Sequence, residues 1–373
     1  SVKAGEGDKR RLTQKTLGEG LGLTPEGAYF TIFRDHVTGL QYIRSSKELC
    51  EKGLYVELGA YNYHVFIDFR EVRDNQWQQY AQVANYLNGR GAPSVEDVFK
   101  EILLQPVQHT FKELINANIF RRLIEARVLQ ADVKPEQTIM EEIEQKMANL
   151  LLEAKFSGGS EEEGALAKEV RQKLEVVLRL PAISSRFPWV DAKDVTKEKL
   201  TDHPITWWTL LSWLFVHALG KVVNQKDFPE LSRSWIDEWR LGKTILDVMS
   251  DLGVEEEPAR RSVTLIKLLT VYQSWSEEKK PSRVLDSILK DTDVQQFLQI
   301  NRYNDILWFN REAFDDLLWW LMVLAAVEIS SDPQRPAHQG ARDLEDCYGT
   351  IQRLKEAAKK SGYQVEKLLA ALR

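Results

Sequence analysis

The side chains that could do acid–base chemistry occur mostly in short acidic clusters. SEEEG (160–164), EEIE (141–144) and VEEEP (254–258) are interpreted as helix N-terminal or solvated charges, because the helix dipole favours negative charge at helix starts. Glycosidase chemistry instead needs two carboxylates about 5–5.5 Å or 6.5–9.5 Å apart across one bond. A linear series of helices does not show such a separation. The carboxylates therefore predict no catalytic residue.

Sequence motifs for other chemistries do not occur. The chain has no G-x-G-x-x-G, G-x-x-x-x-G-K-[ST], H-E-x-x-H or G-x-S-x-G segment, and no histidine has a partner at a zinc-ligand spacing. His217, on the apolar run 205–220, is interpreted as a buried core or interface histidine, with a ligand role as the alternative. His64 is expected to face solvent. We predict no metal and no cofactor.

Tryptophans are the residues that could bind sugars. Sugar rings stack on exposed indole faces, and 11 tryptophans are many for this length. Trp189, which follows a proline in RFPWVD, is the first carbohydrate-stacking candidate, and Trp77 is the second; core packing is the competing interpretation of both. Five others lie in apolar helical runs and are assigned to the core: Trp207, Trp208, Trp213, Trp319 and Trp320.

The composition narrows the class of protein. The chain has 373 residues, enough for two domains, since one core seldom exceeds about 250–300 residues. Its 50 basic and 56 acidic residues give a net charge of −6, which argues against a general nucleic-acid-binding surface. Cys50 and Cys347 lie far apart and are expected to be unpaired.

Membrane and export signals are also lacking. The longest apolar run, 205–220, is shorter than the roughly 20 residues that cross a bilayer. The N-terminal stretch SVKAGEGDKRR has no apolar region typical of a signal peptide, so a cytoplasmic protein is expected. The natural start could still lie upstream.

Hydrophobic periodicity divides the chain into two parts. A period of two up to residue 72 predicts four strands in two hairpins, at 28–34, 40–44, 54–58 and 61–72. The last strand has one apolar face, made of Tyr61, Tyr63, Val65, Ile67 and Phe69. From residue 74 the period becomes helical. A first helix at 74–88 is expected to cover that face, and ten or more helices follow.

The predicted fold class is α+β and mostly α, with a small antiparallel sheet at the N-terminus followed by a large all-helical domain. We expect a flexible arm at 1–24 and a β-rich domain with a covering helix at 25–92. A helical bundle with a mobile loop near 155–164 fills 93–373.

One region resembles a known family. The segment GLYVELGAYNYHVFIDFREV (53–72), with AYFTIFRDHVTGLQYIRSSKEL (28–49) and YLNGRGAPSVEDVFKEILLQPV (86–107), is similar to the C-terminal β-domain region of large bacterial proteins in the α-amylase superfamily of glycoside hydrolases. The resemblance covers residues 28–107. Its motif is a β-pattern, and the family's catalytic signatures have no counterpart in this chain, so no catalytic residue is carried over.

The resemblance implies a non-catalytic accessory region of an enzyme that acts on α-glucans, giving structural support, assembly or glucan contact. Its expected partners are an α-glucan and the catalytic barrel of the parent enzyme. A homo-oligomer is an open alternative, and neither nucleic acid nor a membrane is expected. Two other functions remain open: a helical scaffold or protein-interaction protein unrelated to carbohydrate, and an independent enzyme with a site assembled from helices.

Overall fold

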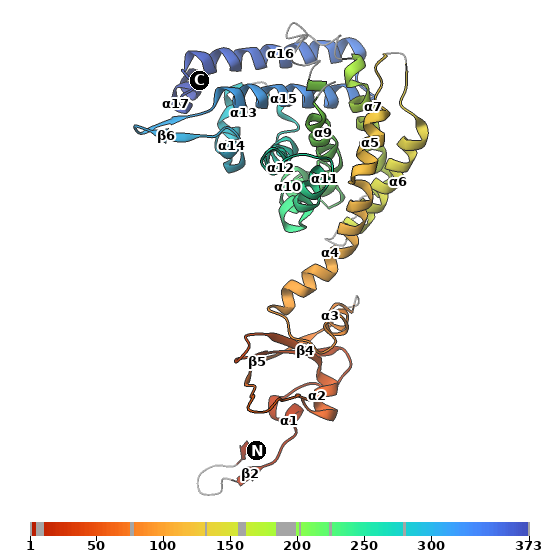
Figure 1. Cartoon of the computed structure of the whole chain (residues 1–373), viewed down its shortest axis with the longest axis vertical. Coiled ribbons are helices and arrows are strands. Elements are labelled where there is room, and N and C mark those ends of the chain that lie inside the picture. Colours follow the sequence, from red (N-terminus) through yellow and green to blue (C-terminus); the bar gives the residue numbers. More distant parts are fainter. Residues whose placement is uncertain are drawn as a thin grey trace. The chain divides into compact units, whose positions relative to one another are not determined.

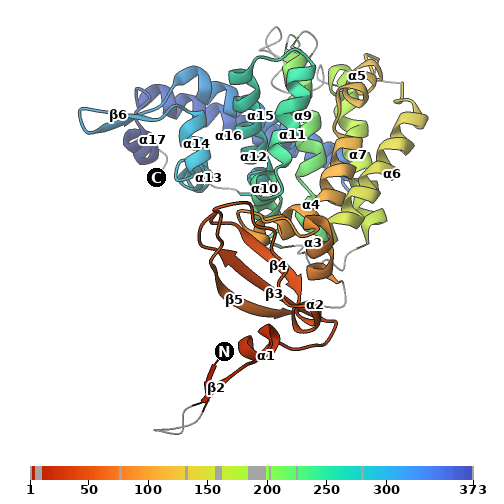
Figure 2. The same cartoon turned by 60° about the horizontal axis from the view of Figure 1, so that its bottom comes forward.

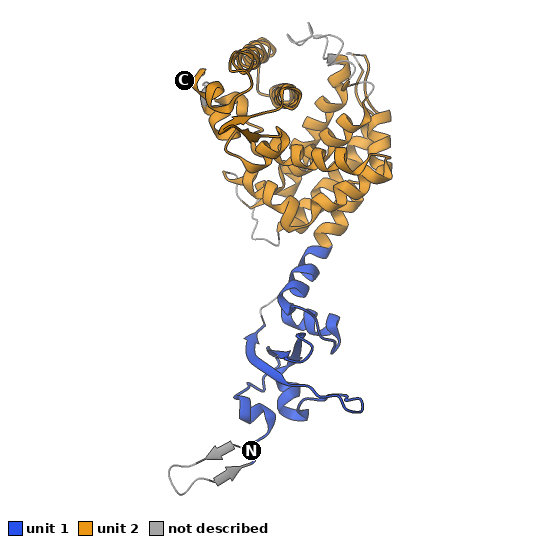
Figure 3. Cartoon of the chain, turned by 60° about the vertical axis from the view of Figure 1, so that its left-hand side comes forward, with its two compact units in different colours: residues 1–105 blue, residues 106–373 orange. Residues whose placement is uncertain are grey.

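The computed structural model describes residues 2–4, 11–74, 78–130, 133–155, 162–183, 199–200, 203–223, 226–278 and 281–371. It is 66% helical, with a small antiparallel sheet near the N-terminus and a large helical region, so the predicted α+β, mostly α class is confirmed. The chain divides into two compact units, residues 1–105 (unit 1) and 106–373 (unit 2), as Figure 3 shows by colour. The division falls at Pro106, inside helix α4 (Val95–Leu114).

Unit 1 contains a three-stranded antiparallel sheet. Its strands β3 (Tyr29–Asp35), β4 (Gln41–Ser45) and β5 (Phe66–Arg73) lie in the order β4-β3-β5 (Figure 2). Helices α1 (Leu17–Leu21) and α2 (Ser46–Lys52) precede and follow the hairpin β3–β4. A separate two-stranded ribbon, β1 (Val2–Ala4) with β2 (Arg11–Thr13), lies in the segment predicted to be a flexible arm.

The predicted strand at 54–58 is wrong, and so is the first part of the predicted strand 61–72. Residues 53–65 contain no strand, and β5 begins only at Phe66. The cause lies in the partner strand: β3 ends at Asp35, which pairs with Phe66, and the chain then turns toward β4. Residues before Phe66 therefore have no strand to pair with, whatever their alternation.

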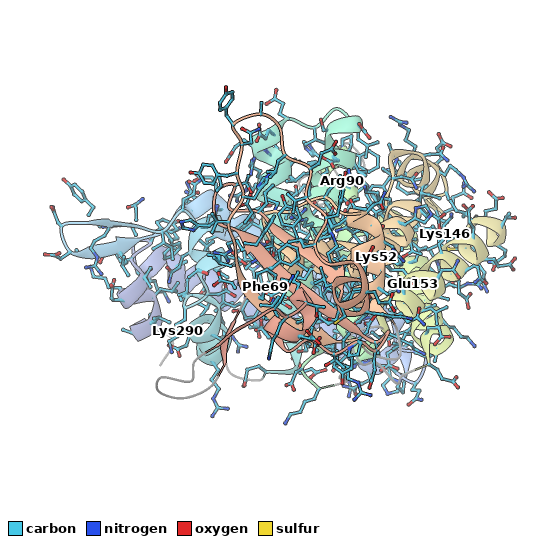
Figure 4. All side chains as sticks on the ribbon, turned by 90° about the horizontal axis from the view of Figure 1, so that it is seen from below. Lys52, Phe69, Arg90, Lys146, Glu153 and Lys290 are labelled. Carbon is cyan, nitrogen blue, oxygen red and sulfur yellow. The ribbon has the colours of Figure 1, made fainter. Side chains whose placement is uncertain are left out.

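The predicted apolar face of the last strand is also wrong. Tyr61, Tyr63 and Val65 are exposed. Within β5, Asp68 has a left-handed backbone (φ +56°) at an irregularity in the pairing with β3. Ile67 consequently pairs with Arg34, whereas the Phe69 ring, labelled in Figure 4, stacks on Phe33 at 5.0 Å. Because Phe33 and Arg34 point to opposite faces, Ile67 and Phe69 do too.

The core of unit 1 lies between the sheet and two helices. Helix α3 (Gln79–Leu87) and the first turns of α4 cover the sheet face that carries Phe30 and Ile32 (Figure 2). The expected covering helix was to pack on the face of Tyr61, Tyr63, Val65, Ile67 and Phe69; α3 instead packs on the face of Phe30 and Ile32, where its Tyr80, Ala84 and Leu87 join the core. The apolar core members are Phe30, Ile32, Ile43, Val83, Leu87, Ala92 and Val95, with Val72, Tyr80, Ala81, Ala84, Val98, Phe99 and Ile102 packed against them.

Unit 2 is a helical assembly. After α4 its elements are α5 (Ala117–Glu125), α6 (Gln137–Ala154), α7 (Glu163–Ile183), α9 (Pro204–Val216), η5 (Leu219–Val222), α10 (Phe228–Glu238), α11 (Leu241–Asp251), α12 (Glu256–Val271), η6 (Trp275–Glu277), α13 (Pro281–Ile288), α14 (Thr292–Phe297), α15 (Arg311–Ser331), α16 (Ala337–Lys360) and α17 (Val365–Ala371). A short hairpin, β6 (Asn301–Tyr303) with β7 (Ile306–Trp308), interrupts the helices.

Helices α9 and α15 form the centre of unit 2. Almost every side chain of α9 is buried, as expected of a helix that is apolar on all sides. Trp207, Trp208, Trp213 and Trp320 are buried, which confirms their assignment to the core, and Trp319 is half-buried. No helix among the described residues is long and apolar enough to cross a membrane.

The small hairpin was not predicted from the sequence. Its turn residues Asn304 and Asp305 both have positive φ, +49° and +61°. Such a two-residue turn suits the right-handed twist of the strands that it joins, and Asn and Asp tolerate it best. The dipeptide Asn304-Asp305 between Tyr303 and Ile306 was the available signal.

Candidate functional site: a polar cleft in unit 2

Unit 2 contains a cleft with a volume of about 1070 Å³. Its walls come from α7, the segment from η5 to the start of α10, the turn at 273–278, the end of α15, and α16. Figure 1 shows these helices in the upper part of the ribbon, where α15 and α16 run alongside each other. Charged side chains of both signs make up half of the lining residues, and the other half are neutral polar or apolar, including Phe228, Trp275 and Ile329.

Lys173 on α7 is the centre of a hydrogen-bond network at the base of the cleft. Its side chain is only 6% exposed. The Lys173 Nζ atom lies 2.7 Å from Glu328 Oε1, 3.0 Å from His217 Nε2 and 3.6 Å from Glu169 Oε1. An ammonium group has three N–H donors; Glu328 and His217 accept two of them, and Glu169, at 3.6 Å, is an ion-pair partner rather than a hydrogen-bond acceptor. A buried ammonium is tolerated here because it is paired and hydrogen-bonded.

His217, which follows α9, accepts from Lys173 as a neutral ring. Its Nδ1 lies 2.8 Å from the carbonyl oxygen of Leu214 and therefore carries the proton, which leaves Nε2 as the acceptor. Burial, followed by the charges of Lys173 and Lys221, lowers the pKa of His217 well below its usual range. The Trp213 ring stacks on the imidazole at 4.6 Å. The prediction of a buried core histidine is confirmed.

Glu169 and Lys221, which also line the cleft, extend the network. Lys221 Nζ lies 2.6 Å from Glu169 Oε1 and also 4.9 Å from the centre of the Phe228 ring. Burial alone would raise the pKa of Glu169, but the ammonium groups of Lys221 and Lys173 outweigh it and lower that pKa. Glu169 is therefore a carboxylate at neutral pH.

The network does not suit acid–base catalysis. A glycosidase needs a carboxylic acid with a raised pKa to protonate the leaving group. Glu169 has a lowered pKa, and Glu328 accepts a hydrogen bond directly from the Lys173 ammonium. His217 holds no free lone pair, because Lys173 donates to it. The arrangement offers fixed donors and acceptors for a ligand rather than a group ready to transfer a proton.

The other wall of the cleft is also built from ion pairs. Arg335 lies 2.7 Å from Asp343 and 3.4 Å from Asp332. Nearby, Cys347 is buried, and burial together with Asp343 and Asp346 raises the pKa of its thiol to about 11. Cys347 is therefore a protonated thiol at neutral pH and no nucleophile. Both cysteines are unpaired, as predicted.

Two carboxylates that line the cleft are not part of an ion pair. They are Glu277 on η6 and Asp346 on α16, and neither makes an ion pair with another described residue. Glu345, the neighbour of Asp346 on α16, is exposed but does not line the cleft. No group of three or more His, Cys, Asp or Glu side chains in the described ranges could hold a metal ion.

The two tryptophans predicted as stacking candidates, Trp189 and Trp77, lie outside the described residues. Trp319 lines a smaller cleft of about 240 Å³, where Lys199 Nζ lies 4.6 Å from the ring centre and occupies its face.

The expectation that His64 faces solvent is wrong, because its Nδ1 bonds to the buried Asp35 at 2.8 Å.

Sequence reasoning missed Lys173, Glu328 and Glu169. An available signal was a lone charged residue in an apolar run. Glu328 follows a stretch of eleven uncharged residues in α15, and His217 follows the apolar run of α9. Isolated charges in such runs need buried partners. The partner itself could not be found, because Lys173 lies on a different helix, more than 150 residues before Glu328.

Comparisons with known proteins add no assignment. No protein-family model matches the chain, and searches of curated proteins and of solved structures found no match.

Proposed function

We propose that this chain is a non-catalytic accessory region of an α-amylase-family enzyme and that the cleft in unit 2 contacts an α-glucan. The resemblance of residues 28–107 to the β-domain region of that family supports the choice of enzyme. The catalytic barrel of a parent enzyme is then the partner of this chain. The role of the cleft is to hold a glucan chain, not to cleave it.

The observation that carries the proposal is the paired state of the charges in the cleft. Lys173, Glu169 and Glu328 hold one another in place, so their donors and acceptors are oriented before any ligand arrives. Preorganised polar groups lower the entropy cost of binding. A glucan presents many hydroxyl groups that both donate and accept, which suits a wall of alternating ammonium and carboxylate groups. Such a wall binds sugars without offering a general acid.

A binding experiment with matched variants tests the proposal. The intact chain is titrated with maltoheptaose by isothermal calorimetry, in parallel with a double variant, Glu277→Ala with Asp346→Ala, and with Glu345→Ala as control. We expect saturable binding, at least several-fold weaker in the double variant and unchanged in the control, since losing each hydrogen bond to a charged group costs roughly 1.5–3 kcal/mol. Equal affinity of all three proteins would contradict a role for the cleft. No binding by the wild-type chain would favour the helical scaffold instead.

A further inference from the structure

A loop in unit 1 exposes a run of large side chains. Residues 54–65, here called the tyrosine loop, join α2 to β5 without forming a helix or strand. Tyr55, Tyr61 and Tyr63 are 84%, 106% and 68% exposed, and Leu58 and Val65 are exposed as well. Single exposed apolar residues are common, whereas a cluster of this kind marks an interaction site.

The end of the tyrosine loop is firmly anchored. His64 Nδ1 donates to Asp35 Oδ2 at 2.8 Å, and the backbone N–H of Val65 approaches Asp35 Oδ1 at 3.4 Å. The backbone N–H of His36 donates to the carbonyl oxygen of Val65 at 2.7 Å. The His64 ring also stacks on Phe66. The backbone next to Tyr63 is therefore held in place, which fixes the position of the exposed Tyr63 ring.

Asp35 connects this anchor to the turn after β3. Its side chain is fully buried and accepts further hydrogen bonds from Thr38 Oγ1 and the backbone N–H of Val37. Burial alone would raise the pKa of Asp35, but the hydrogen bonds from Thr38, His64 and the two backbone amides outweigh it and hold the pKa well below its usual range. One carboxylate thus fixes the turn and the end of the loop together.

The tip of the loop carries backbone strain. Tyr61 has φ +66°, in the left-handed region that bulky residues rarely adopt. It lies in a turn closed by a hydrogen bond of 3.1 Å from the backbone N–H of Asn62 to the carbonyl oxygen of Gly59. Strain of this kind persists where the surrounding structure imposes it, and it gathers at binding sites. Here it turns an aromatic ring fully into solvent.

The chemistry of the tip selects a neutral ligand. Residues 58–63, LGAYNY, contain no charged side chain. Nucleic acids and anionic membrane surfaces are bound by Lys and Arg, which this segment lacks. Tyrosine rings with their hydroxyls, next to the Asn62 amide, combine flat apolar faces with neutral donors and acceptors. A pyranose ring has the same combination, with C–H faces and a rim of hydroxyls.

We infer that the tyrosine loop is a second binding site, separate from the cleft, for a neutral polysaccharide. Tyr61 and Tyr63 stack on sugar rings, and Asn62 bonds to sugar hydroxyls. Asp35 and His64 are positioning residues that fix the loop. The choice of an α-glucan as the ligand rests on the proposed function, whereas the site itself does not.

The experiment measures retention of the intact chain on insoluble polysaccharides. Granular starch and microcrystalline cellulose are compared for the wild type, for the double variant Tyr61→Ala with Tyr63→Ala, and for Tyr303→Ala. Tyr303, on β6 in unit 2, is 68% exposed, as Tyr63 is, and serves as the matched control. We expect the double variant to bind starch about tenfold more weakly, because both aromatic faces that stack on the sugar rings are lost. The control should bind as the wild type does.

The outcomes separate this inference from the proposed function. Binding to cellulose alone, lost in the double variant, would support the loop site and contradict the α-glucan assignment. Starch binding that is equal in the wild type and the double variant would overturn the loop site and leave the cleft standing. Retention of the wild type on neither polymer would overturn both. Loop-dependent binding to phosphatidylcholine vesicles, without binding to polysaccharide, would replace the inference by a membrane contact.

A second comparison tests the positioning residues. His64→Ala removes the hydrogen bond to Asp35, while His64→Gln keeps an N–H donor at a similar place. We expect His64→Ala to weaken starch retention and His64→Gln to restore most of it, with the far-ultraviolet circular dichroism of all proteins unchanged. If both variants bind as the wild type does, His64 does not position the loop.

Discussion

Asp35 in unit 1 and His217 in unit 2 are both fully buried and both have a lowered pKa, but the causes are opposite. Around Asp35, four hydrogen-bond donors stabilise the charged form. Around His217, burial and the two ammonium groups of Lys173 and Lys221 exclude the charged form. The comparison shows that in unit 1 the charged Asp35 carboxylate fixes the tyrosine loop. In unit 2 the hydrogen-bond network of Lys173 depends on a neutral His217 ring.

The largest expected effect concerns the length of chain that unit 1 needs in order to fold. Val95 is fully buried in the core of unit 1, and Val98, Phe99 and Ile102 pack against it. A fragment 14–93 lacks these four side chains, which costs on the order of 5 kcal/mol of burial. That is as large as the whole stability of many domains. We expect 14–105 to show a cooperative thermal transition by circular dichroism and 14–93 to be unfolded or aggregated. A soluble monomeric 14–93 with a cooperative melt would contradict this.

The next effect concerns the network of unit 2. Lys173→Met keeps the length of the side chain but leaves His217 Nε2 and Glu328 without their donor. We expect a loss of about 2–3 kcal/mol in the free energy of unfolding of unit 2, measured by urea denaturation. Lys290→Met is the control, because Lys290, labelled in Figure 4, forms an exposed ion pair with Asp286. It should cost below about 0.5 kcal/mol. Equal losses would show that the buried network contributes no stability.

The two buried groups should also respond to acid in different ranges. Below pH 6.5 an unfolded histidine takes up a proton that the folded His217 does not, since its folded pKa is lowered. Stability from this group is complete above pH 6.5 and falls with pH by up to about 1.4 kcal/mol per unit. We expect urea titrations of unit 2 between pH 7.5 and 5.5 to show this slope. His217→Gln, which keeps an acceptor for Lys173, should flatten it; an unchanged slope in that variant would assign the effect to other groups.

The smallest effect is a change in the pKa of Asp35. The folded-state pKa is lowered, so the stabilisation is complete above the ordinary value of 3.8 and is lost only as the pH falls further. Thr38→Val removes the hydroxyl that donates to Asp35 Oδ2 at 2.7 Å. Carbon-detected NMR titration of the Asp35 carboxyl should show a higher pKa in Thr38→Val than in the wild type, and still below 3.8. Identical titration curves would mean that Thr38 does not stabilise the charge.

Periodicity in the sequence predicted the helical part of the fold well. A helix shows in the sequence through residues only three or four positions apart, so it can be predicted without knowledge of contacts between distant residues. The apolar run of α9 and the buried position of His217 were predicted in this way.

Periodicity predicted the sheet less well, because a strand needs a partner. The alternation of Tyr61, Tyr63 and Val65 is that of a strand, yet β3 ends at Asp35 and leaves these residues unpaired. The left-handed Asp68 then puts Ile67 and Phe69 on opposite faces of the sheet, and a single residue in this conformation gives no signal in the alternation. The cleft could not be predicted from the sequence either, because its charged side chains come from helices that are far apart in the chain.

The central claim is that the cleft binds an α-glucan without cleaving it. The most direct measurement follows maltoheptaose mixed with the intact chain, by calorimetry for binding and by reducing-end analysis of the same sample after prolonged incubation. The account predicts a saturable heat signal, weakened by Glu277→Ala with Asp346→Ala, and no new reducing ends. Release of reducing ends by the wild type, absent in a heat-denatured sample, would contradict the claim, as would the absence of any binding.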